Sequence, residues 1–319
     1  MKNKSKLRKI ALVFAFVAVG ALAFQGFKTF FPAQAAELSY RIDFARAGVH
    51  ETTVGGLHGF YRDGCQSAKS PAQCSCVVLV HGLGDQAMTW RKVLLEPEAE
   101  WTKSVRLYAV DLPGFGKSPP PPSPADYRVR TLAKMLGDAL GSVPDCPRWM
   151  VVGNSFGGWV SAWLALEWGQ NVNKLVLVGS AGMKSTTTKE QHGASAFTEP
   201  TIESLKEFQR KAYAHPRQLT DQMWKAAIAS MKKGNSKEVI AAQVPEDDLD
   251  TYLPSLRKPT MVFRGEADQI IARGAVQEMA RLIPGAIYRE APECGHLPQK
   301  ECPAALMKVL NEMLLFGAM

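Results

Sequence analysis

The chain has 319 residues, of which 46% are hydrophobic and 21% are charged, a composition typical of globular proteins that excludes a disordered or low-complexity chain. Its formal net charge is +8, but six of its 38 basic residues precede the first acidic residue, Glu37. The remaining 32 basic residues are balanced by 30 acidic ones, which excludes a broad electrostatic surface for nucleic acid.

The amino terminus has the pattern of a secretory signal. Five of the first nine residues are basic, and residues 10–24 form an uncharged, mostly apolar run. Two small-x-small cleavage sequences follow, at 21–23 and 33–35, and the pattern does not choose between them. An uncleaved membrane anchor is the alternative, although a span usually needs about 20 residues; a buried core helix is disfavoured. We expect residues 1–35 to be a signal peptide or anchor and the protein to be exported, either periplasmic or secreted.

The six cysteines agree with an oxidising compartment, but they allow about 15 pairings and the sequence does not select one. Cys74 and Cys76 are closer together than the usual zinc-binding pair, and no matching second pair lies near a histidine. We therefore expect no metal site. Cys294 and Cys302 bracket His296, where a disulfide and two free thiols fit the sequence equally well.

From Cys76 onward, short apolar runs alternate with helix-length segments, which predicts an α/β fold. Upstream, residues 38–61 alternate more loosely and predict two antiparallel edge strands. The apolar runs are typical of strands buried on both faces of a parallel sheet. The predicted parallel strands are Cys76–Val80, Val105–Val110, Trp149–Val152, Lys174–Val178, Pro259–Phe263 and Ala286–Arg289. The predicted helices are Ala125–Leu140, Phe156–Trp168, Arg273–Leu282 and Cys302–Leu315.

About 75 residues separate the fourth and fifth of these strands, which is too long for a loop. Apolar residues at helical spacing over 201–214 and 220–233 predict two amphipathic helices. We expect residues 183–257 to form a helical cap whose apolar faces lie over the carboxyl edge of the sheet, or pack only on each other. The apolar side chains expected to shape a pocket there are Phe197, Phe208, Met223, Trp224 and Met231.

Residues 153–158, Gly-Asn-Ser-Phe-Gly-Gly, match G-x-S-x-G between a predicted buried strand and an apolar helix. Glycines on both sides permit a sharp turn that places the Ser155 hydroxyl above the sheet, at a helix amino terminus. This context favours a nucleophilic serine over a plain glycine-rich turn.

A serine nucleophile needs a base and an acid that orients the base. His296 follows the last predicted strand and Asp268 the one before it, in the order Ser, Asp, His. Glu266 is the rival acid, since it lies only two residues before Asp268. The histidines that lie outside strand ends are expected on the surface: His50, His58, His192 and His215.

Acyl transfer also needs donors for the developing oxyanion. The backbone N–H of Leu83, after the first parallel strand, and that of Phe156, after the nucleophile, are the candidates. We expect His81 to stabilise the turn before Leu83 and not to act as a base.

Four motifs together resemble the α/β-hydrolase family, most closely its bacterial lipases and esterases, over about residues 38–315. They are His-Gly-x-Gly at 81–84, Asp-Leu-Pro-Gly-Phe-Gly at 111–116, Gly-Asn-Ser-x-Gly-Gly at 153–158 and Cys-Gly-His-x-Pro at 294–298. The resemblance implies a mostly parallel, eight-stranded sheet flanked by helices. It also implies a core formed by residues 36–182 and 258–319, a helical cap after strand six, and no cofactor. The cysteines at 65–76 match no pattern of the family.

We therefore expect an exported serine carboxylester hydrolase that forms an acyl-enzyme on a small-molecule ester or lipid, with membrane association through the amino-terminal segment. The same fold includes carbon-carbon bond hydrolases, which typically have Trp soon after the catalytic histidine, where this chain has Leu297 and Pro298. Relatives with Asp in place of Ser155 are disfavoured. Carbon-carbon cleavage, peroxide-dependent chemistry and a non-catalytic ligand-binding role are the alternatives.

Overall fold

The computed structural model describes residues 32–65, 74–96, 104–187 and 194–316. The predicted signal run at 10–24 and the first cleavage sequence lie outside these residues. The chain divides into two units, Met1–Gly48 and Val49–Met319. Within the described ranges, no helix is both long enough and apolar enough to cross a membrane.

The first unit contains helix α2 (Pro32–Ala47), so the prediction of a strand from residue 38 was wrong. The helix is stabilised here by side-chain pairs four residues apart, which a strand would not bring together. Arg41 pairs with Glu37 one turn earlier, and the Tyr40 and Phe44 rings meet at 5.7 Å one turn apart. Gly48, with φ of 66°, follows the helix in the left-handed conformation common at helix ends. The second candidate cleavage sequence, at 33–35, lies in the first turn of α2.

The two predicted antiparallel strands are β1 (Val49–Val54) and β2 (Leu57–Asp63). They form a hairpin through Gly55 and Gly56, both with positive φ, as a tight two-residue turn requires.

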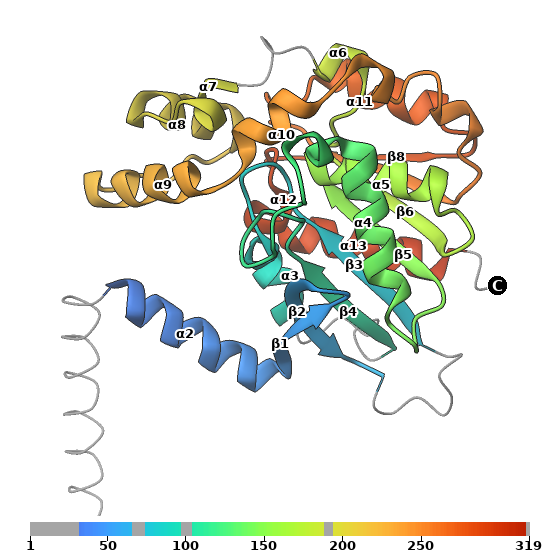
Figure 1. Cartoon of the computed structure of the whole chain (residues 1–319), viewed down its shortest axis with the longest axis horizontal. Coiled ribbons are helices and arrows are strands. Elements are labelled where there is room, and N and C mark those ends of the chain that lie inside the picture. The colour runs from blue at the N-terminus through green and yellow to red at the C-terminus, as the bar shows by residue number, and fades with distance from the viewer. Residues whose placement is uncertain (1–31, 66–73, 97–103, 188–193, 317–319) are drawn as a thin grey trace, which may run out of the picture. The chain divides into compact units, whose positions relative to one another are not determined.

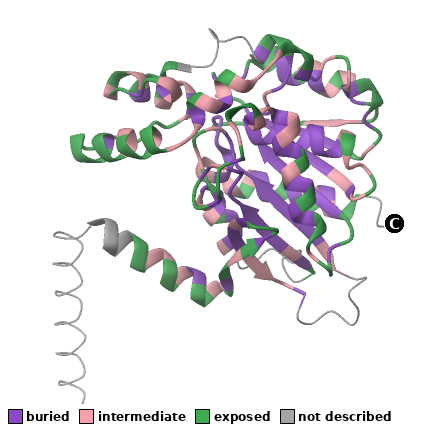
Figure 2. Ribbon diagram, viewed as in Figure 1, coloured by how far each residue is buried: buried purple, intermediate pink, exposed green. Residues whose placement is uncertain are grey.

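The second unit is built on one eight-stranded sheet, which confirms the predicted fold class (Figure 1). The strand order is β1-β2-β4-β3-β5-β6-β7-β8, and only the pairs β1–β2 and β2–β4 are antiparallel. The parallel strands are β3 (Ser75–Val80), β4 (Val105–Val110), β5 (Trp149–Asn154), β6 (Val172–Val178), β7 (Thr260–Gly265) and β8 (Ile287–Ala291). The central strands are almost entirely buried (Figure 2), as their unbroken apolar runs predict.

Helices cover both faces of the sheet (Figure 1). On one face α4 (Val129–Gly141) packs on α5 (Phe156–Glu167), and on the other α13 (Pro303–Leu315) contacts β6 and β7. The predicted helix at 125–140 is divided, because Arg128 is extended between η4 (Pro124–Tyr127) and α4. The remaining elements of the core are η2 (Ala87–Trp90), α3 (Arg91–Leu95), α11 (Arg273–Leu282) and α12 (Pro298–Glu301).

A helical insert lies between β6 and β7. Its elements are α6 (Lys184–Thr187), α7 (Ala194–Thr198), α8 (Ile202–Ala212), α9 (Asp221–Lys233), α10 (Ser236–Ala242), η5 (Pro245–Asp247) and η6 (Leu253–Ser255). Threonine side chains cap α8 and α9: Thr201 accepts the Ser204 N–H and Thr220 accepts the Met223 N–H. Leu205 and Trp224 pack in a small apolar cluster between the helices.

Three disulfides join all six cysteines: Cys65–Cys74, Cys76–Cys146 and Cys294–Cys302. The cysteine cluster that matched no family pattern is thus divided between two bridges, and a bridge closes the loop that contains His296. Three disulfides indicate an oxidising, extracytoplasmic location.

Candidate active site

Ser155 stands at a sharp turn between β5 and α5. Its φ and ψ are 56° and −122°, and Ser155 and Glu293 are the two non-glycine residues with positive φ in the described part of the chain. A non-glycine residue in this region costs about 1–3 kcal/mol and persists only where its surroundings hold it. The motif glycines are part of those surroundings, because a Cβ on Gly153 would overlap the Gly157 carbonyl.

The structure brings His296 and Asp268 together at the same edge of the sheet. The His296 Nδ1 lies 2.9 Å from Asp268 Oδ2, and both side chains are buried. The other carboxylate oxygen, Oδ1, accepts the N–H groups of Ile270 and Ile271. An ionised carboxylate only accepts, so Nδ1 donates to it, and in the neutral ring Nε2 is then the acceptor. The rival acid Glu266 is exposed, and among the described residues no hydrogen bond or ion pair joins it to His296.

Two backbone N–H groups lie beside the nucleophile without a hydrogen-bond partner among the described residues: those of Leu83 and Phe156. The loop after β3 passes close to Ser155, because a Cβ on Gly82 would lie 3.2 Å from the serine Cβ. The Phe156 N–H is the first of helix α5, where the helix has no internal acceptor for it. Both are therefore free to bind an oxyanion.

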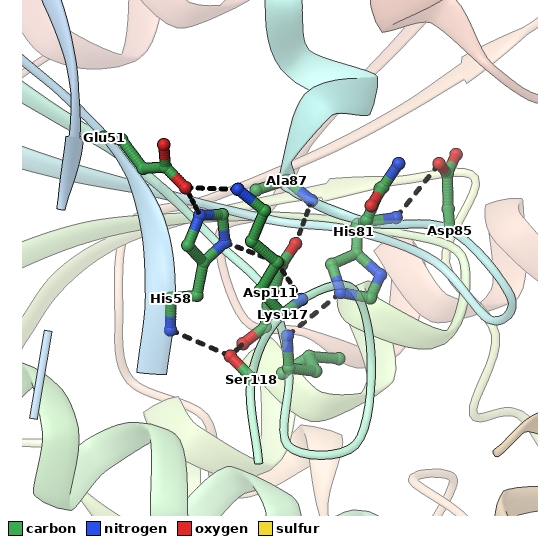
Figure 3. A network of polar contacts seen from close by, with 10 residues as sticks. Glu51, His58, His81, Asp85, Ala87, Asp111, Lys117 and Ser118 are labelled. Atoms are coloured by element: carbon green, nitrogen blue, oxygen red, sulfur yellow. Dashed lines mark hydrogen bonds and ion pairs between the residues drawn. The ribbon is translucent and has the colours of Figure 1, made fainter. Parts of the chain in front are cut away.

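His81 uses both ring nitrogens to hold the turn before Leu83 (Figure 3). Its Nε2 accepts the Leu112 N–H at 3.0 Å, so the ring proton is on Nδ1, which donates to the Gly82 carbonyl at 2.8 Å. Burial lowers the pKa of this imidazole, which keeps it neutral. This geometry agrees with a turn-stabilising residue and leaves no nitrogen for proton transfer.

Asn154, which the sequence analysis missed, connects the nucleophile turn to the loop between β8 and α12 that contains His296, residues 292–297, which we call the histidine loop. Its Nδ2 donates to the backbone carbonyls of His296 and Val178, both at 3.0 Å, and its Oδ1 accepts from Gln299. The side chain is fully buried. The one sequence feature that could have indicated this role is the position of Asn154 directly before the candidate nucleophile in the Gly-Asn-Ser motif.

The histidine loop is also bonded to the insert at the end of α8. The His296 N–H donates to the Ala212 carbonyl at 2.6 Å. The Glu301 carboxylate accepts the N–H groups of Gly295, Ala214 and His215. The insert is therefore joined to the histidine loop by one backbone hydrogen bond and by the shared Glu301 carboxylate.

A mostly apolar cavity of about 360 Å³ contains Ser155 and His296 at its wall. Four of the five insert side chains predicted to shape a pocket line it: Phe197, Phe208, Trp224 and Met231. The prediction for Met223 was wrong, because this side chain is 46% exposed and lies on the outer side of α9. Further apolar lining that the sequence analysis missed comes from Trp159, Leu205, Tyr213, Ile240, Ile270 and Ile271.

One ion pair lies in this wall: Lys300 Nζ is 2.6 Å from Asp85 Oδ2. Burial favours the neutral acid, but the lysine charge outweighs it and lowers the pKa of Asp85. Burial likewise opposes the ammonium, yet the carboxylate raises the pKa of Lys300. Both groups are therefore charged at neutral pH. Within the described ranges, no group of three His, Cys, Asp or Glu residues is placed to hold a metal ion.

Several known proteins of one family are similar to this chain. The model of the alpha/beta hydrolase family matches residues 77–309. A 2-hydroxy-6-oxononadienedioate/2-hydroxy-6-oxononatrienedioate hydrolase from Cupriavidus pinatubonensis is 28% identical over 257 residues, covering 76% of this chain and 88% of that protein. A pimeloyl-acyl-carrier-protein methyl ester esterase from Vibrio vulnificus is 27% identical over 235 residues, covering 70% and 87%.

Among solved structures, a bacterial membrane phospholipase A superposes with a TM-score of 0.72 at 21% identity. The match covers 95% of this chain and 97% of that one. At this identity the likeness concerns the fold alone.

Proposed function

The chain belongs to the α/β-hydrolase family, and from this premise we propose that it is an exported serine carboxylester hydrolase that acts through an acyl-enzyme. The observation that carries the proposal is the meeting of three features at one apolar cavity. These are the serine on its strained turn, the His296–Asp268 pair, and the two unpaired N–H groups of Leu83 and Phe156.

In the proposed mechanism the Ser155 hydroxyl attacks the ester carbonyl carbon while His296 Nε2 takes its proton. Asp268 holds the imidazole in the tautomer that leaves Nε2 free and stabilises the imidazolium. The N–H groups of Leu83 and Phe156 bind the oxyanion of the tetrahedral intermediate. The intermediate collapses and expels the alcohol, which takes the proton from His296. Water, deprotonated by His296, then attacks the acyl-serine and releases the acid.

The charges of the cavity wall favour a neutral acyl group. The Cupriavidus relative is named for dioate substrates, which carry two carboxylates. Among the described residues that line this cavity, Lys300 is the one lysine or arginine, and Asp85 already neutralises it. A dianion would enter without an unpaired cation to compensate for its lost hydration. An apolar ester meets no such cost.

Carbon-carbon bond hydrolysis is the second candidate, because several relatives at 27–29% identity are named as hydrolases of ring-opened substrates such as 2-hydroxy-6-oxononadienedioate and 2-hydroxymuconate semialdehyde. The esterase relative is almost equally similar. The charge of the cavity is therefore our reason for preferring the ester.

We further propose a division of the chain into an export signal or anchor at 1–35, a core at 36–182 and 258–319, and a cap at 183–257. The basic, then apolar, amino-terminal sequence and the three disulfides support export to the periplasm or beyond. Membrane association would depend on residues 10–24.

The test is hydrolysis of p-nitrophenyl esters from acetate to palmitate by the exported protein and its Ser155→Ala variant. We expect a clear rate that the variant lacks, with a preference for medium or long chains. A ring-opened dienedioate is assayed in parallel. Folded protein that cleaves this dianion but none of the esters would replace the proposal by the carbon-carbon reaction.

A further inference from the structure

Asp111, the first residue of the Asp-Leu-Pro-Gly-Phe-Gly motif, is a buried carboxylate outside the cavity. Its Oδ1 accepts the Ala87 N–H at 2.6 Å, and its Oδ2 accepts the Lys117 N–H at 2.9 Å (Figure 3). Gly116 allows this close approach, because a Cβ there would overlap the carboxylate. The motif thus folds its own backbone around one buried acid.

His58 is the ionisable side chain hydrogen-bonded to that carboxylate, which corrects the expectation that it lies on the surface. Its Nδ1 is 2.6 Å from Asp111 Oδ2, and its Nε2 is 2.7 Å from Glu51 Oε1. The ring is only 14% exposed. Carboxylate oxygens only accept, so both ring nitrogens must donate and the ring is an imidazolium. The fourth charged group here, the Lys117 ammonium, contacts Glu51.

The loop that carries the Leu83 N–H is bonded at both ends to the corner after β4. At its start, the His81 ring binds both the loop and the Leu112 N–H. At its end, Asp111 accepts the Ala87 N–H. Figure 3 shows the two attachments side by side. The position of the Leu83 donor therefore depends on the geometry of this corner.

We propose that Asp111, with the His58 imidazolium as its counter-ion, is a positioning residue that holds the Leu83 N–H where the oxyanion forms. The proposal rests on the proposed function, since it concerns that same oxyanion site. Removing the cation leaves a buried carboxylate uncompensated, which favours its protonation or exposure and loosens the bond to Ala87. The oxyanion exists only in the transition state and intermediate, so the loss falls on kcat and not on KM.

The test uses His58→Gln in the full-length protein, with His50→Gln as the matched control. His50 is an exposed histidine of β1, so the control makes the same chemical change outside the network. Rates are measured on p-nitrophenyl butyrate and on its thiono analogue, in which sulfur replaces the carbonyl oxygen. Sulfur is a weak acceptor, so the ratio of the two rates reports how well the oxyanion donors are placed.

For His58→Gln we expect kcat on the oxygen ester to fall about tenfold, less than the about 100-fold loss of removing a donor outright. The ratio of the oxygen-ester rate to the thiono-ester rate should fall as well, while KM changes less than about twofold. The His50→Gln control should keep the parental kcat, KM and rate ratio. An unchanged kcat, or a lower kcat with an unchanged ratio, would overturn the proposal. If His58→Gln does not fold, Glu51→Gln, at a half-exposed partner, must show the same direction of change in the ratio.

These outcomes are separate from failure of the proposed function. That failure would show as a parent protein without esterase activity, whereas failure of the positioning role requires an active parent whose rate ratio the variants leave unchanged.

Discussion

The Lys300 ammonium lies 2.6 Å from the Asp85 carboxylate, and this pair joins the loop after β3 to the helix that follows His296. The two residues are 215 positions apart in the sequence. Their side chains are 35% and 22% exposed, so solvent screens part of the attraction. The pair connects the two loops that carry the proposed oxyanion donor and the proposed base.

A double-mutant cycle over Asp85→Asn and Lys300→Met should give a coupling free energy of about 1 kcal/mol, the upper range for a partly exposed pair. Either single variant should lower the free energy of unfolding, and the double variant should recover part of the loss. Urea denaturation of the four proteins measures the cycle. Additive effects of the two single changes would show that the pair is energetically silent.

The same pair predicts a pH dependence of stability. The lowered pKa of Asp85 gives stability that is present above the unfolded value of about 3.9 and is lost as pH falls through the folded pKa. The raised pKa of Lys300 gives stability that is present below about 10.4 and is lost as pH rises through the folded pKa. The stability difference between the parent and the Asp85→Asn, Lys300→Met double variant, in which neither position titrates, should therefore be constant from about pH 5 to 9 and shrink outside this window. Unfolding midpoints across pH measure it, and a difference that changes near pH 7 would contradict the assignment.

Asp268→Asn should lower kcat by about 10⁴-fold while the fold is kept, because the amide stabilises the wrong imidazole tautomer. Glu266→Gln, two residues earlier on an exposed side chain, is the matched control and should retain parental kcat. Steady-state kinetics on one p-nitrophenyl ester compare the two. The reverse pattern would assign the acid to Glu266.

The Cys294–Cys302 disulfide should matter for activity as well as for stability, since it closes the loop that contains His296. Replacing both cysteines by Ala is expected to cost about 2–4 kcal/mol of unfolding free energy and to lower kcat. The Cys65–Cys74 bridge spans a similar length of chain, nine residues against eight, and is the matched control. Its removal should lower stability without lowering kcat at 25 °C. If removing either disulfide changed kcat equally, the closure of the histidine loop would have no particular importance for activity.

Trp224→Ala should widen the cavity and shift the best ester towards longer acyl chains, because the indole lines the wall and is 5% exposed. Met223→Ala, at the adjacent residue on the outer side of α9, should leave the chain-length profile unchanged. Profiles from acetate to palmitate for both variants make the comparison. A profile that Trp224→Ala does not move would place the acyl chain elsewhere.

The sheet could be predicted because its signal is local. Unbroken apolar runs such as Val105–Val110 are sufficient to identify a strand buried on both faces, and the structure has that strand with the same bounds. The helix at 32–47 was missed because residues 38–47 also fit a loose alternation, and the pairs at helical spacing, Glu37 with Arg41 and Tyr40 with Phe44, decide in favour of the helix.

The candidate nucleophile, acid and base could be selected because each follows a strand, and parallel strands bring their carboxyl ends to one edge. The ion pairs near these residues could not be predicted from the sequence. His58 and Asp111 are 53 residues apart, and Lys300 and Asp85 four times as far, so nothing local marks either pair. The exposure of Met223 depends on which face of α9 packs against α8. Helical spacing alone does not determine that face.

The hydrogen bond from the His296 N–H to the Ala212 carbonyl limits how the insert can be exchanged with that of a relative. Exchanging residues 183–257 for the insert of a relative would also replace Ala212, Ala214 and His215. The backbone groups of these residues form hydrogen bonds with the His296 N–H and the Glu301 carboxylate. Chimeras that graft only the cavity-lining parts of α7 and α9, and retain the end of α8, keep these bonds. Substrate range can then be changed without moving the imidazole.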